Sequence, residues 1–161
     1  MNDPKPASLL FVCMGNICRS PTVEAVARVE FARAGIDVAV ASAGTANYHV
    51  GASADRRAIA VAEASGYPLR QHRARQVEAH DFVDHDHLLV MDRVNLQALR
   101  ARMPAMAHKR VALFLAFAEI AGIDELPDPY YGGAADFQRA LDLARDGIGA
   151  LVRRLRHNRN S

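Results

Sequence analysis

The chain has 161 residues, which is the usual length of a single globular domain with a full hydrophobic core. Its net charge of +2 is too small to indicate a nucleic-acid-binding protein, and no apolar stretch approaches the roughly 20 residues that a membrane span requires. The two cysteines, Cys13 and Cys18, cannot form a disulfide framework, so we expect a protein of the cytoplasm with reduced thiols.

The N-terminal residues 1–7 contain two prolines and no hydrophobic segment, so we expect a short disordered lead-in rather than a signal peptide. Apolar runs bounded by polar residues then alternate with segments of helical periodicity. Ser20 is a good helix N-cap, and Gly35 is a typical residue at a helix end. In chain order we predict a strand over 9–13, a helix over 20–35, a strand over 37–43, a helix over 55–65, a strand over 87–91, a helix over 93–101 capped by Asp92, a strand over 111–117 and a long helix over 137–155.

This alternation predicts an α/β fold, in which a single three-layer domain over residues 8–161 holds a four-stranded parallel sheet flanked by helices. The segment 118–136 interrupts the pattern. It contains Pro127, Pro129 and a pair of glycines, so we predict a long loop before the last helix. Loops at the carboxyl ends of parallel strands commonly carry the functional residues of such folds.

The stretch CMGNICRS, residues 13–20, directly follows the first predicted strand. A disulfide between its two cysteines would close a very small ring, and a metal site would need more ligands than this spacing provides. A buried structural cysteine at the end of a strand is a third interpretation. A reactive thiol explains more of the stretch, because it also accounts for the glycine, the asparagine and the arginine.

A tight loop between a strand and a helix N-terminus points backbone N–H groups inward and forms an anion-binding nest, most commonly for phosphate. We therefore predict a phosphate-binding loop after the first strand. Gly15 and Asn16 tolerate the left-handed conformation that such a loop requires, and Arg19 can bind two phosphate oxygens. The same positive field favours the thiolate form of Cys13, with Ser20 hydrogen-bonded to the sulfur.

The stretch CMGNICRSP resembles the C-x5-R-S signature of the low-molecular-weight protein tyrosine phosphatases, which also lies near the N-terminus in that family. The run Asp128-Pro129-Tyr130-Tyr131-Gly132 is similar to the motif that carries the family's general acid late in the chain. Further similarity lies in SAGT (42–45), HRARQ (72–76) and LLVMDRVNL (88–96), so the resemblance covers residues 8–156.

The resemblance implies a protein tyrosine phosphatase that hydrolyses phosphotyrosine and small aryl phosphates without a cofactor or metal. Cys13 would form a phosphocysteine, Arg19 and the loop amides would hold the phosphate oxygens, and Asp128 would act as general acid and then as base. Without the cysteine loop, Asp128 would be interpreted as an ordinary turn residue between two prolines.

Further site residues follow from the resemblance. The phosphate-binding loop comprises Met14, Gly15, Asn16, Ile17, Cys18, Arg19 and Ser20. The residues expected to support this loop by hydrogen bonds are Asn16, Ser20, Ser42 and His72, and those expected to line the substrate cleft are Met14, Tyr48, Tyr130 and Tyr131. Cys18 would act as a redox guard that traps an oxidised Cys13 in a reversible disulfide. A surface position for His72 and ordinary packing for the tyrosines stay open as alternatives.

Three rival functions share this fold or this binding chemistry. Arsenate reductases of the same fold need further cysteines downstream, and none follows Cys18. Protein-arginine phosphatases have a similar loop with Thr at the place of Ile17, so Ile17 favours an aryl substrate. A non-catalytic phosphotyrosine-binding module would lack Cys13, Arg19 or Asp128, and all three are present.

The expected partners are a phosphotyrosine-containing protein substrate and inhibitory phosphate or other oxyanions, with no nucleic acid, and we expect a monomer. Secretion by a signal-free route, as in some bacterial relatives, stays open. The segment HDFVDHDH, residues 80–87, suggests a metal site, but it lacks a helical pair of histidines with a nearby third ligand. We therefore predict a solvated segment before the third strand.

Overall fold

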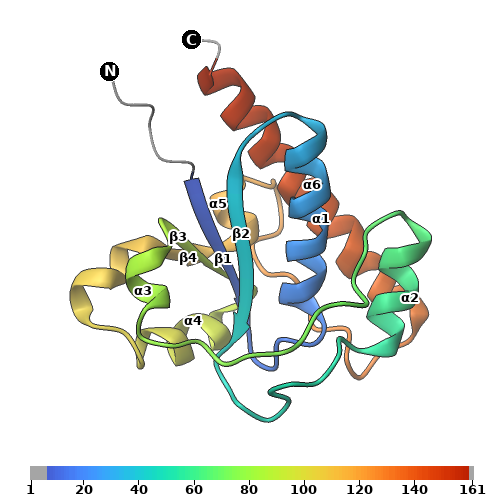
Figure 1. Ribbon diagram of the computed structural model, residues 1–161, viewed down its shortest axis with the longest axis horizontal. Helices are drawn as coiled ribbons and strands as arrows, with labels where there is room; N and C mark the ends of the chain where they lie inside the picture. Colours follow the sequence, from blue (N-terminus) through green and yellow to red (C-terminus); the bar gives the residue numbers. More distant parts are fainter. Residues whose placement is uncertain (1–6, 160–161) are drawn as a thin grey trace.

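The computed structural model in Figure 1 describes residues 7–159, so most of the predicted N-terminal lead-in lies outside the described residues. Its strands form one parallel sheet in the order β2-β1-β3-β4. The elements are β1 (Ala7–Cys13), α1 (Arg19–Arg33), β2 (Val38–Gly44), α2 (Arg56–Ala64), α3 (Asp81–Asp84), β3 (His87–Val90), α4 (Arg93–Arg100), the 3-10 helix η1 (Ala105–Arg110), β4 (Val111–Leu113), α5 (Phe114–Phe117) and α6 (Ala134–Arg159).

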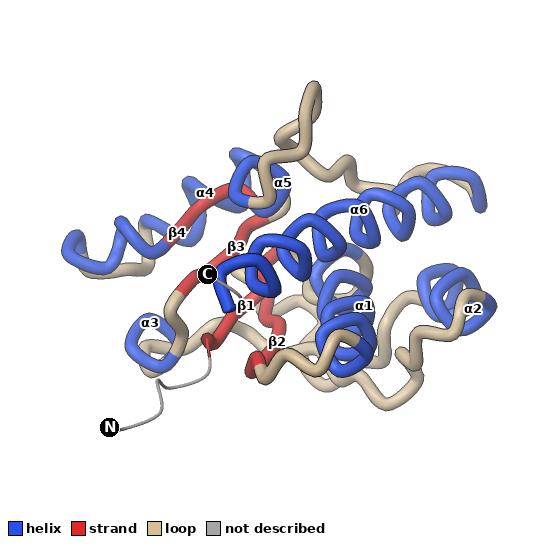
Figure 2. The backbone as a smooth tube through the Cα atoms, turned by 90° about the horizontal axis from the view of Figure 1, so that it is seen from above, coloured by secondary structure: helices blue, strands red, loops and turns tan. Residues whose placement is uncertain are grey.

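Helices cover both faces of the sheet, which confirms the predicted three-layer α/β fold (Figure 2). The side chains of the central strand β1 alternate between two hydrophobic clusters, because successive residues of a strand point to opposite faces. Phe11 belongs to the cluster that α1 and α6 cover, and Leu10 belongs to the cluster beneath α3 and α4. This packing fixes the carboxyl end of β1, at Cys13, in the middle of the sheet edge.

The long closing helix was predicted correctly from its apolar spacing, although α6 begins three residues before the predicted start. The residues of its predicted apolar face are buried from Phe137 to Leu151, and α6 packs beside α1. The segment between α5 and α6 contains no strand or helix, so the predicted long loop is present. It returns the chain across the end of the sheet where β1 stops (Figure 1).

Two local predictions are wrong. The apolar run 111–117 is a strand only as far as Leu113, after which Phe114 begins one turn of helix. Apolar residues that are buried on all sides give the same pattern in a strand and in a helix, so the sequence could not distinguish the two. Ser20 is not the N-cap of α1, because the helix begins at Arg19 after Cys18 and the Ser20 hydroxyl is engaged elsewhere.

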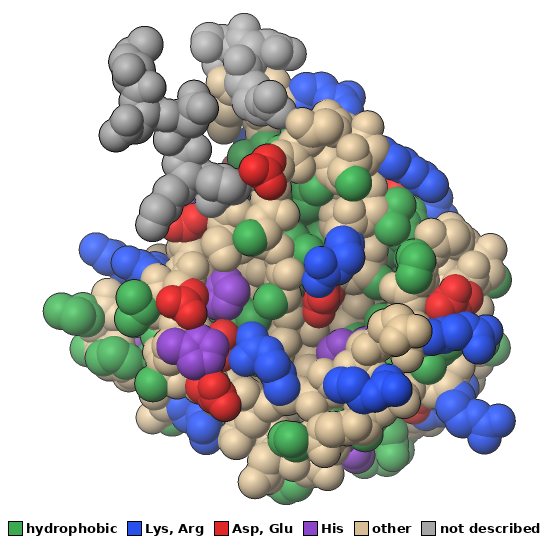
Figure 3. Space-filling view, viewed as in Figure 1, with side chains coloured by type: hydrophobic (Ala, Val, Ile, Leu, Met, Phe, Trp, Pro, Cys, Tyr) green, Lys and Arg blue, Asp and Glu red, His purple; other side chains and the backbone are tan. Residues whose placement is uncertain are grey.

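The surface carries charges of both signs. On the face shown in Figure 3, Lys and Arg side chains are interspersed with Asp and Glu side chains, as the small net charge leads one to expect. None of the helices within residues 7–159 combines the length and the apolar character needed to cross a membrane.

Candidate active site

The loop between β1 and α1, residues 14–18, lies at the carboxyl end of the central strand. Its conformation depends on Asn16, whose φ of 57° places it in the left-handed region, as predicted. Gly15 does not have a positive φ, so that part of the prediction is wrong. An added Cβ at Gly15 would lie 3.0 Å from Cδ2 of His49, so a larger residue there would require the His49 side chain to shift.

Cys13 lies at the floor of this loop and is 4% exposed. The backbone N–H of Asn16 donates to its sulfur at 3.3 Å, and Ser20 Oγ lies 3.0 Å from the sulfur. Asn16 Nδ2 donates to Ser20 Oγ at 2.9 Å, which leaves the hydroxyl hydrogen of Ser20 free to point at the sulfur. The sulfur of Cys13 is thus held between a backbone N–H and a hydroxyl group at the start of the helix.

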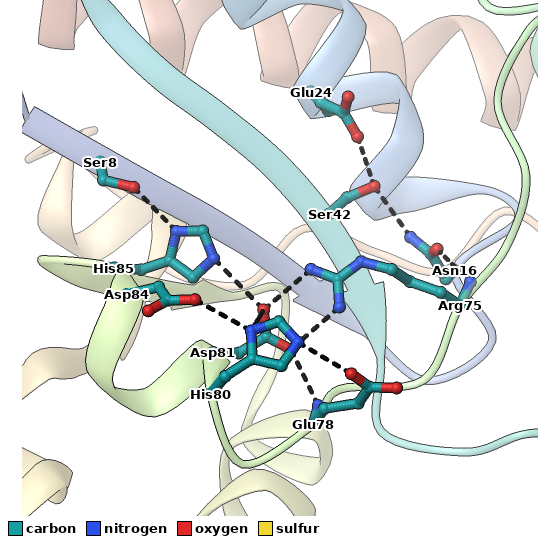
Figure 4. Close-up of polar contacts among 10 residues, drawn as sticks. All are labelled: Ser8, Asn16, Glu24, Ser42, Arg75, Glu78, His80, Asp81, Asp84 and His85. Carbon is teal, nitrogen blue, oxygen red and sulfur yellow. Dashed lines mark hydrogen bonds and ion pairs between the residues drawn. The ribbon is translucent and has the colours of Figure 1, made fainter.

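Asn16 is fully buried and is held by residues from three other segments. Its Nδ2 donates to Ser42 Oγ at 3.0 Å, and Ser42 in turn donates to Glu24 Oε1 at 2.6 Å (Figure 4). The backbone N–H of Arg75 donates to Asn16 Oδ1 at 3.0 Å. His72 Nε2 donates to the backbone carbonyl of Asn16 at 2.7 Å, since a carbonyl can only accept. The structure therefore brings together all four residues predicted to support the loop.

Glu24 and Arg75 also take part in this network but were not predicted as site residues. The guanidinium of Arg75 donates to both oxygens of Asp81 at 2.9 Å, and Asp81 is fully buried (Figure 4). Burial raises the pKa of Asp81, but hydrogen bonds from His85 and Arg75 outweigh that effect and hold the pKa well below its ordinary value. The ion pair thus anchors the segment that contacts Asn16.

This pair also corrects the prediction that residues 80–87 form a solvated segment. Val83, Asp84 and Asp86 are exposed, but Asp81 has no exposed surface and His85 only a small part. His80 pairs with Asp84, and Asp81 binds both His85 and Arg75 (Figure 4). Within residues 7–159, no group of three or more His, Cys, Asp or Glu side chains is placed to hold a metal ion.

Arg19, 5% exposed, lies at the start of α1 and faces the loop that carries Asp128, residues 127–132, which we call the acid loop. Its Nη1 donates to Asp92 Oδ2 at 2.7 Å and to the backbone carbonyl of Leu126 at 2.9 Å. Its Nη2 lies 3.8 Å from Asp128 Oδ2. Asp92 was predicted only as a helix cap. It does cap α4 through Asn95 N–H at 2.8 Å, and it also fixes the guanidinium of Arg19.

Asp128 projects from the loop before α6. The N–H of Tyr130 donates to its Oδ1 at 3.1 Å, which leaves Oδ2 on the side of Arg19. Cys13, Arg19 and Asp128 line the same cavity of about 300 Å³, near the lower limit for small-ligand sites. The other lining residues are Met14, Gly15, Ile17, Cys18, Tyr48, His49, Tyr130 and Tyr131.

All four residues predicted to form the cleft walls line this cavity, and all are exposed. Tyr48 is 74% exposed and Tyr131 is 93% exposed, so neither is used to pack the core. The ring centres of Tyr130 and Tyr131 are 5.0 Å apart with the rings nearly perpendicular. His49 is a further wall residue that the sequence did not reveal. The cavity thus has the loop that follows Cys13 at its floor and aromatic side chains in its walls.

Cys18 lines the same cavity but is 6% exposed, and both cysteines are free. Burial, followed by the negative charge of Asp55, raises the pKa of the Cys18 thiol to about 12. Cys18 is therefore a protonated thiol at neutral pH.

A cysteine sulfur that receives hydrogen bonds inside an anion-binding loop, faced by an arginine and a carboxylate, defines the class of cysteine-dependent phosphatases. The sequence model of the family described as "Low molecular weight phosphotyrosine protein phosphatase" matches residues 8–161. The chain belongs to this family of hydrolases.

Individual relatives and solved structures agree with this assignment. A putative low molecular weight protein-tyrosine-phosphatase of Synechocystis is 43% identical over 147 residues, which cover 89% of this chain and 93% of the relative. A low molecular weight protein-tyrosine-phosphatase of Streptomyces coelicolor is 43% identical over 151 residues, covering 89% and 92%. The crystal structure of a protein tyrosine phosphatase from Entamoeba histolytica, with Hepes in its active site, superposes with a TM-score of 0.88 at 35% identity and covers 95% of this chain and 99% of that one.

Proposed function

We propose that this protein hydrolyses phosphotyrosine in proteins, and small aryl phosphates, through a phosphocysteine on Cys13. The observation that carries the proposal is the position of Cys13, Arg19 and Asp128 around one cavity whose walls are aromatic. The thiolate attacks phosphorus while Arg19 and the loop amides hold the three non-bridging oxygens. Asp128 gives its proton to the departing phenolate oxygen, so the leaving group departs as a neutral phenol.

In the second step Asp128, now a carboxylate, accepts a proton from a water molecule that attacks the phosphocysteine. The products are inorganic phosphate and the regenerated thiolate, to which Ser20 donates its hydrogen bond. Each step needs only the residues of the chain and water, so the proposed reaction uses no metal or cofactor. Phosphate and related oxyanions are expected to inhibit, because they occupy the same loop.

The rival functions are less well supported. Arsenate reduction in this fold would require a cysteine relay, and the chain has no cysteine after Cys18. A protein-arginine phosphatase is expected to have Thr at the place of Ile17, and the aromatic walls formed by Tyr48 and Tyr130 suit the flat ring of phosphotyrosine. We also propose that the protein is a monomer and that it lies in the cytoplasm.

The central test compares the wild-type protein with Cys13→Ser. The variant should lose turnover of 4-nitrophenyl phosphate while retaining binding of inorganic phosphate, measured by calorimetry. Retained turnover would falsify the phosphocysteine mechanism. Addition of EDTA should leave wild-type activity unchanged, and loss of activity would contradict the metal-free reaction. Phosphoarginine should be a much poorer substrate than phosphotyrosine, and the reverse preference would favour the rival phosphatase.

A further inference from the structure

Two charged residues at the start of α2, Asp55 and Arg57, lie between the phosphate-binding loop and the loop that carries Asp128. The proposed reaction makes no use of either residue. The backbone N–H of Asp55 donates to the carbonyl of Ile17 at 2.8 Å, which ties this end of α2 to the phosphate-binding loop. Asp55 Oδ1 also accepts from the N–H of Arg57 at 2.8 Å and so caps the helix.

The side chain of Arg57 reaches in the opposite direction, to the acid loop. Its Nη2 donates to the carbonyl of Tyr130 at 3.0 Å and its Nη1 to the carbonyl of Gly132 at 3.3 Å. Its guanidinium carbon lies 5.6 Å from the ring centre of Tyr130 and 4.4 Å from that of Phe137, within range of cation–π attraction. One side chain thus contacts both sides of the turn that follows Asp128.

Asp55 holds this guanidinium in place. Its Oδ1 accepts from Arg57 Nε at 3.1 Å and its Oδ2 accepts from Nη2 at 3.0 Å, which is the two-bond arrangement that a planar guanidinium forms with a carboxylate. Burial raises the pKa of Asp55, but the hydrogen bonds and the charge of Arg57 outweigh it and lower the pKa. The carboxylate is therefore charged at neutral pH. A lysine could keep the charge but could not form this fork.

Leu126, directly before the acid loop, is held by the Met91 carbonyl and by Arg19, but residues 127–132 have few other attachments. The remaining hydrogen bonds of the loop are internal, such as Gly132 N–H to the carbonyl of Pro129 at 2.8 Å. In the part of the chain that the structure describes, the hydrogen bonds that join residues 127–132 to another segment all come from Arg57. Asp128 lies 3.8 Å from Arg19, beyond hydrogen-bond distance.

We propose that Arg57, anchored by Asp55, is a positioning residue that holds the Asp128 loop over the phosphate-binding loop. The proposal rests on the proposed phosphatase function, because its effect on catalysis passes through Asp128. General acid catalysis depends strongly on the position of the acid relative to the leaving oxygen. Loss of the Arg57 contacts with the acid loop therefore affects the step in which the leaving group is protonated, and not the binding of phosphate.

The kinetic test measures kcat/KM for two substrates in Arg57→Ala, Arg57→Lys and the control Arg56→Ala. Arg56 is the exposed neighbour on the same helix and makes none of these contacts. Phenyl phosphate has a poor leaving group and needs the acid, whereas 4-nitrophenyl phosphate needs it little. We expect Arg57→Ala to lose on the order of tenfold for phenyl phosphate and at most about twofold for 4-nitrophenyl phosphate. Arg57→Lys should resemble Arg57→Ala, and Arg56→Ala should match the wild type.

The effect must also disappear when the acid is absent. In the Asp128→Ala variant, adding Arg57→Ala should cause no further loss of kcat/KM for phenyl phosphate, because Arg57 is proposed to act only through Asp128. Equal losses for both substrates, or full additivity with Asp128→Ala, would show that Arg57 has only a general structural role. Asp55→Asn keeps a helix-capping side chain but removes the charge, so it should show the same substrate dependence in weaker form.

A second measurement is independent of turnover. Amide hydrogen exchange at Tyr130 and Gly132 should be on the order of tenfold faster in Arg57→Ala than in wild type or Arg56→Ala, with α6 unaffected. If amide exchange in this loop is unchanged in Arg57→Ala, Arg57 does not hold the acid loop in place. A wild-type protein that fails to hydrolyse either substrate would refute the proposed function, and the exchange result would still decide whether Arg57 holds the loop.

Discussion

Replacing Cys13 by serine leaves Cys18 as the sole thiol of the chain, and we expect that thiol to resist alkylation in the folded protein. Only the thiolate reacts with iodoacetamide, so the rate follows the thiolate fraction. Burial and the charge of Asp55 raise the pKa of Cys18 from 9.0 to about 12. The contribution of Cys13 is lost in this variant, but the burial, which is the larger cause, remains.

The magnitude follows from the two pKa values. At pH 8 a thiol with a pKa of 9.0 is about one-tenth thiolate, and a thiol with a pKa of about 12 is about one part in ten thousand thiolate. The folded variant should therefore react about a thousandfold more slowly than the same variant in denaturant, before any steric protection is counted. The rate should also rise about tenfold for each pH unit between pH 7 and 9.

The assay measures Cys13→Ser alkylation by intact mass against time, in buffer and in guanidinium chloride. In the wild-type protein, peptide mapping should find the label on Cys13 long before Cys18. A folded rate within about tenfold of the denatured rate would refute the argument, because neither the burial nor the charge of Asp55 would then control the thiol. The same result bears on the predicted redox guard, since a thiol that stays protonated attacks an oxidised Cys13 slowly.

Further substitutions test the packing of α6, the buried ion pair of Asp81 and the role of Arg19. In Gly147→Ala the new Cβ would lie 2.4 Å from Phe114 Cζ, whereas in the control Gly149→Ala the nearest atom would lie 3.4 Å away. Urea unfolding should therefore show Gly147→Ala to be less stable than Gly149→Ala by about 2 kcal/mol. Equal stabilities would mean that the Phe114 ring moves aside freely. Asp81→Asn should be less stable than wild type at pH 7 by about 3 kcal/mol. Because the pKa of Asp81 is lowered in the folded protein, the carboxylate stabilises the fold fully above its unfolded pKa and progressively less as the pH falls below about 4. The difference in free energy of unfolding between wild type and Asp81→Asn should therefore be about 1 kcal/mol smaller at pH 3 than at pH 7. A difference that does not change with pH would contradict this origin. Arg19→Lys should lower kcat/KM for 4-nitrophenyl phosphate about a hundredfold, and a loss under threefold would show that charge alone suffices.

The phosphate-binding loop could be predicted from the sequence because its parts are consecutive. The prediction of an anion site used a strand, Gly15, Asn16, Arg19 and a helix start, all within eight residues, and the structure places that loop at the end of β1. Even there the sequence offered two roles for Ser20, as the helix cap and as a hydrogen-bond partner of the Cys13 sulfur. The structure shows only the second, because the Ser20 hydroxyl lies 3.0 Å from the sulfur and the helix begins one residue earlier. Local helix propensity favours the cap and takes no account of the tertiary partner that competes for the hydroxyl.

The residues that hold the site together carry no comparable local signal. Arg57 follows Arg56 in the first turn of one helix, and nothing in the sequence distinguishes the side chain that binds the acid loop from its exposed neighbour. Their difference arises from partners more than 70 positions later, at Tyr130 and Gly132. Asp92 is similar, since its capping role is local but its bond to Arg19 spans 73 positions. Cys13 and Asp128, the proposed nucleophile and acid, can therefore be picked out from the sequence, whereas the distance between them is set by long-range contacts that only the folded chain reveals.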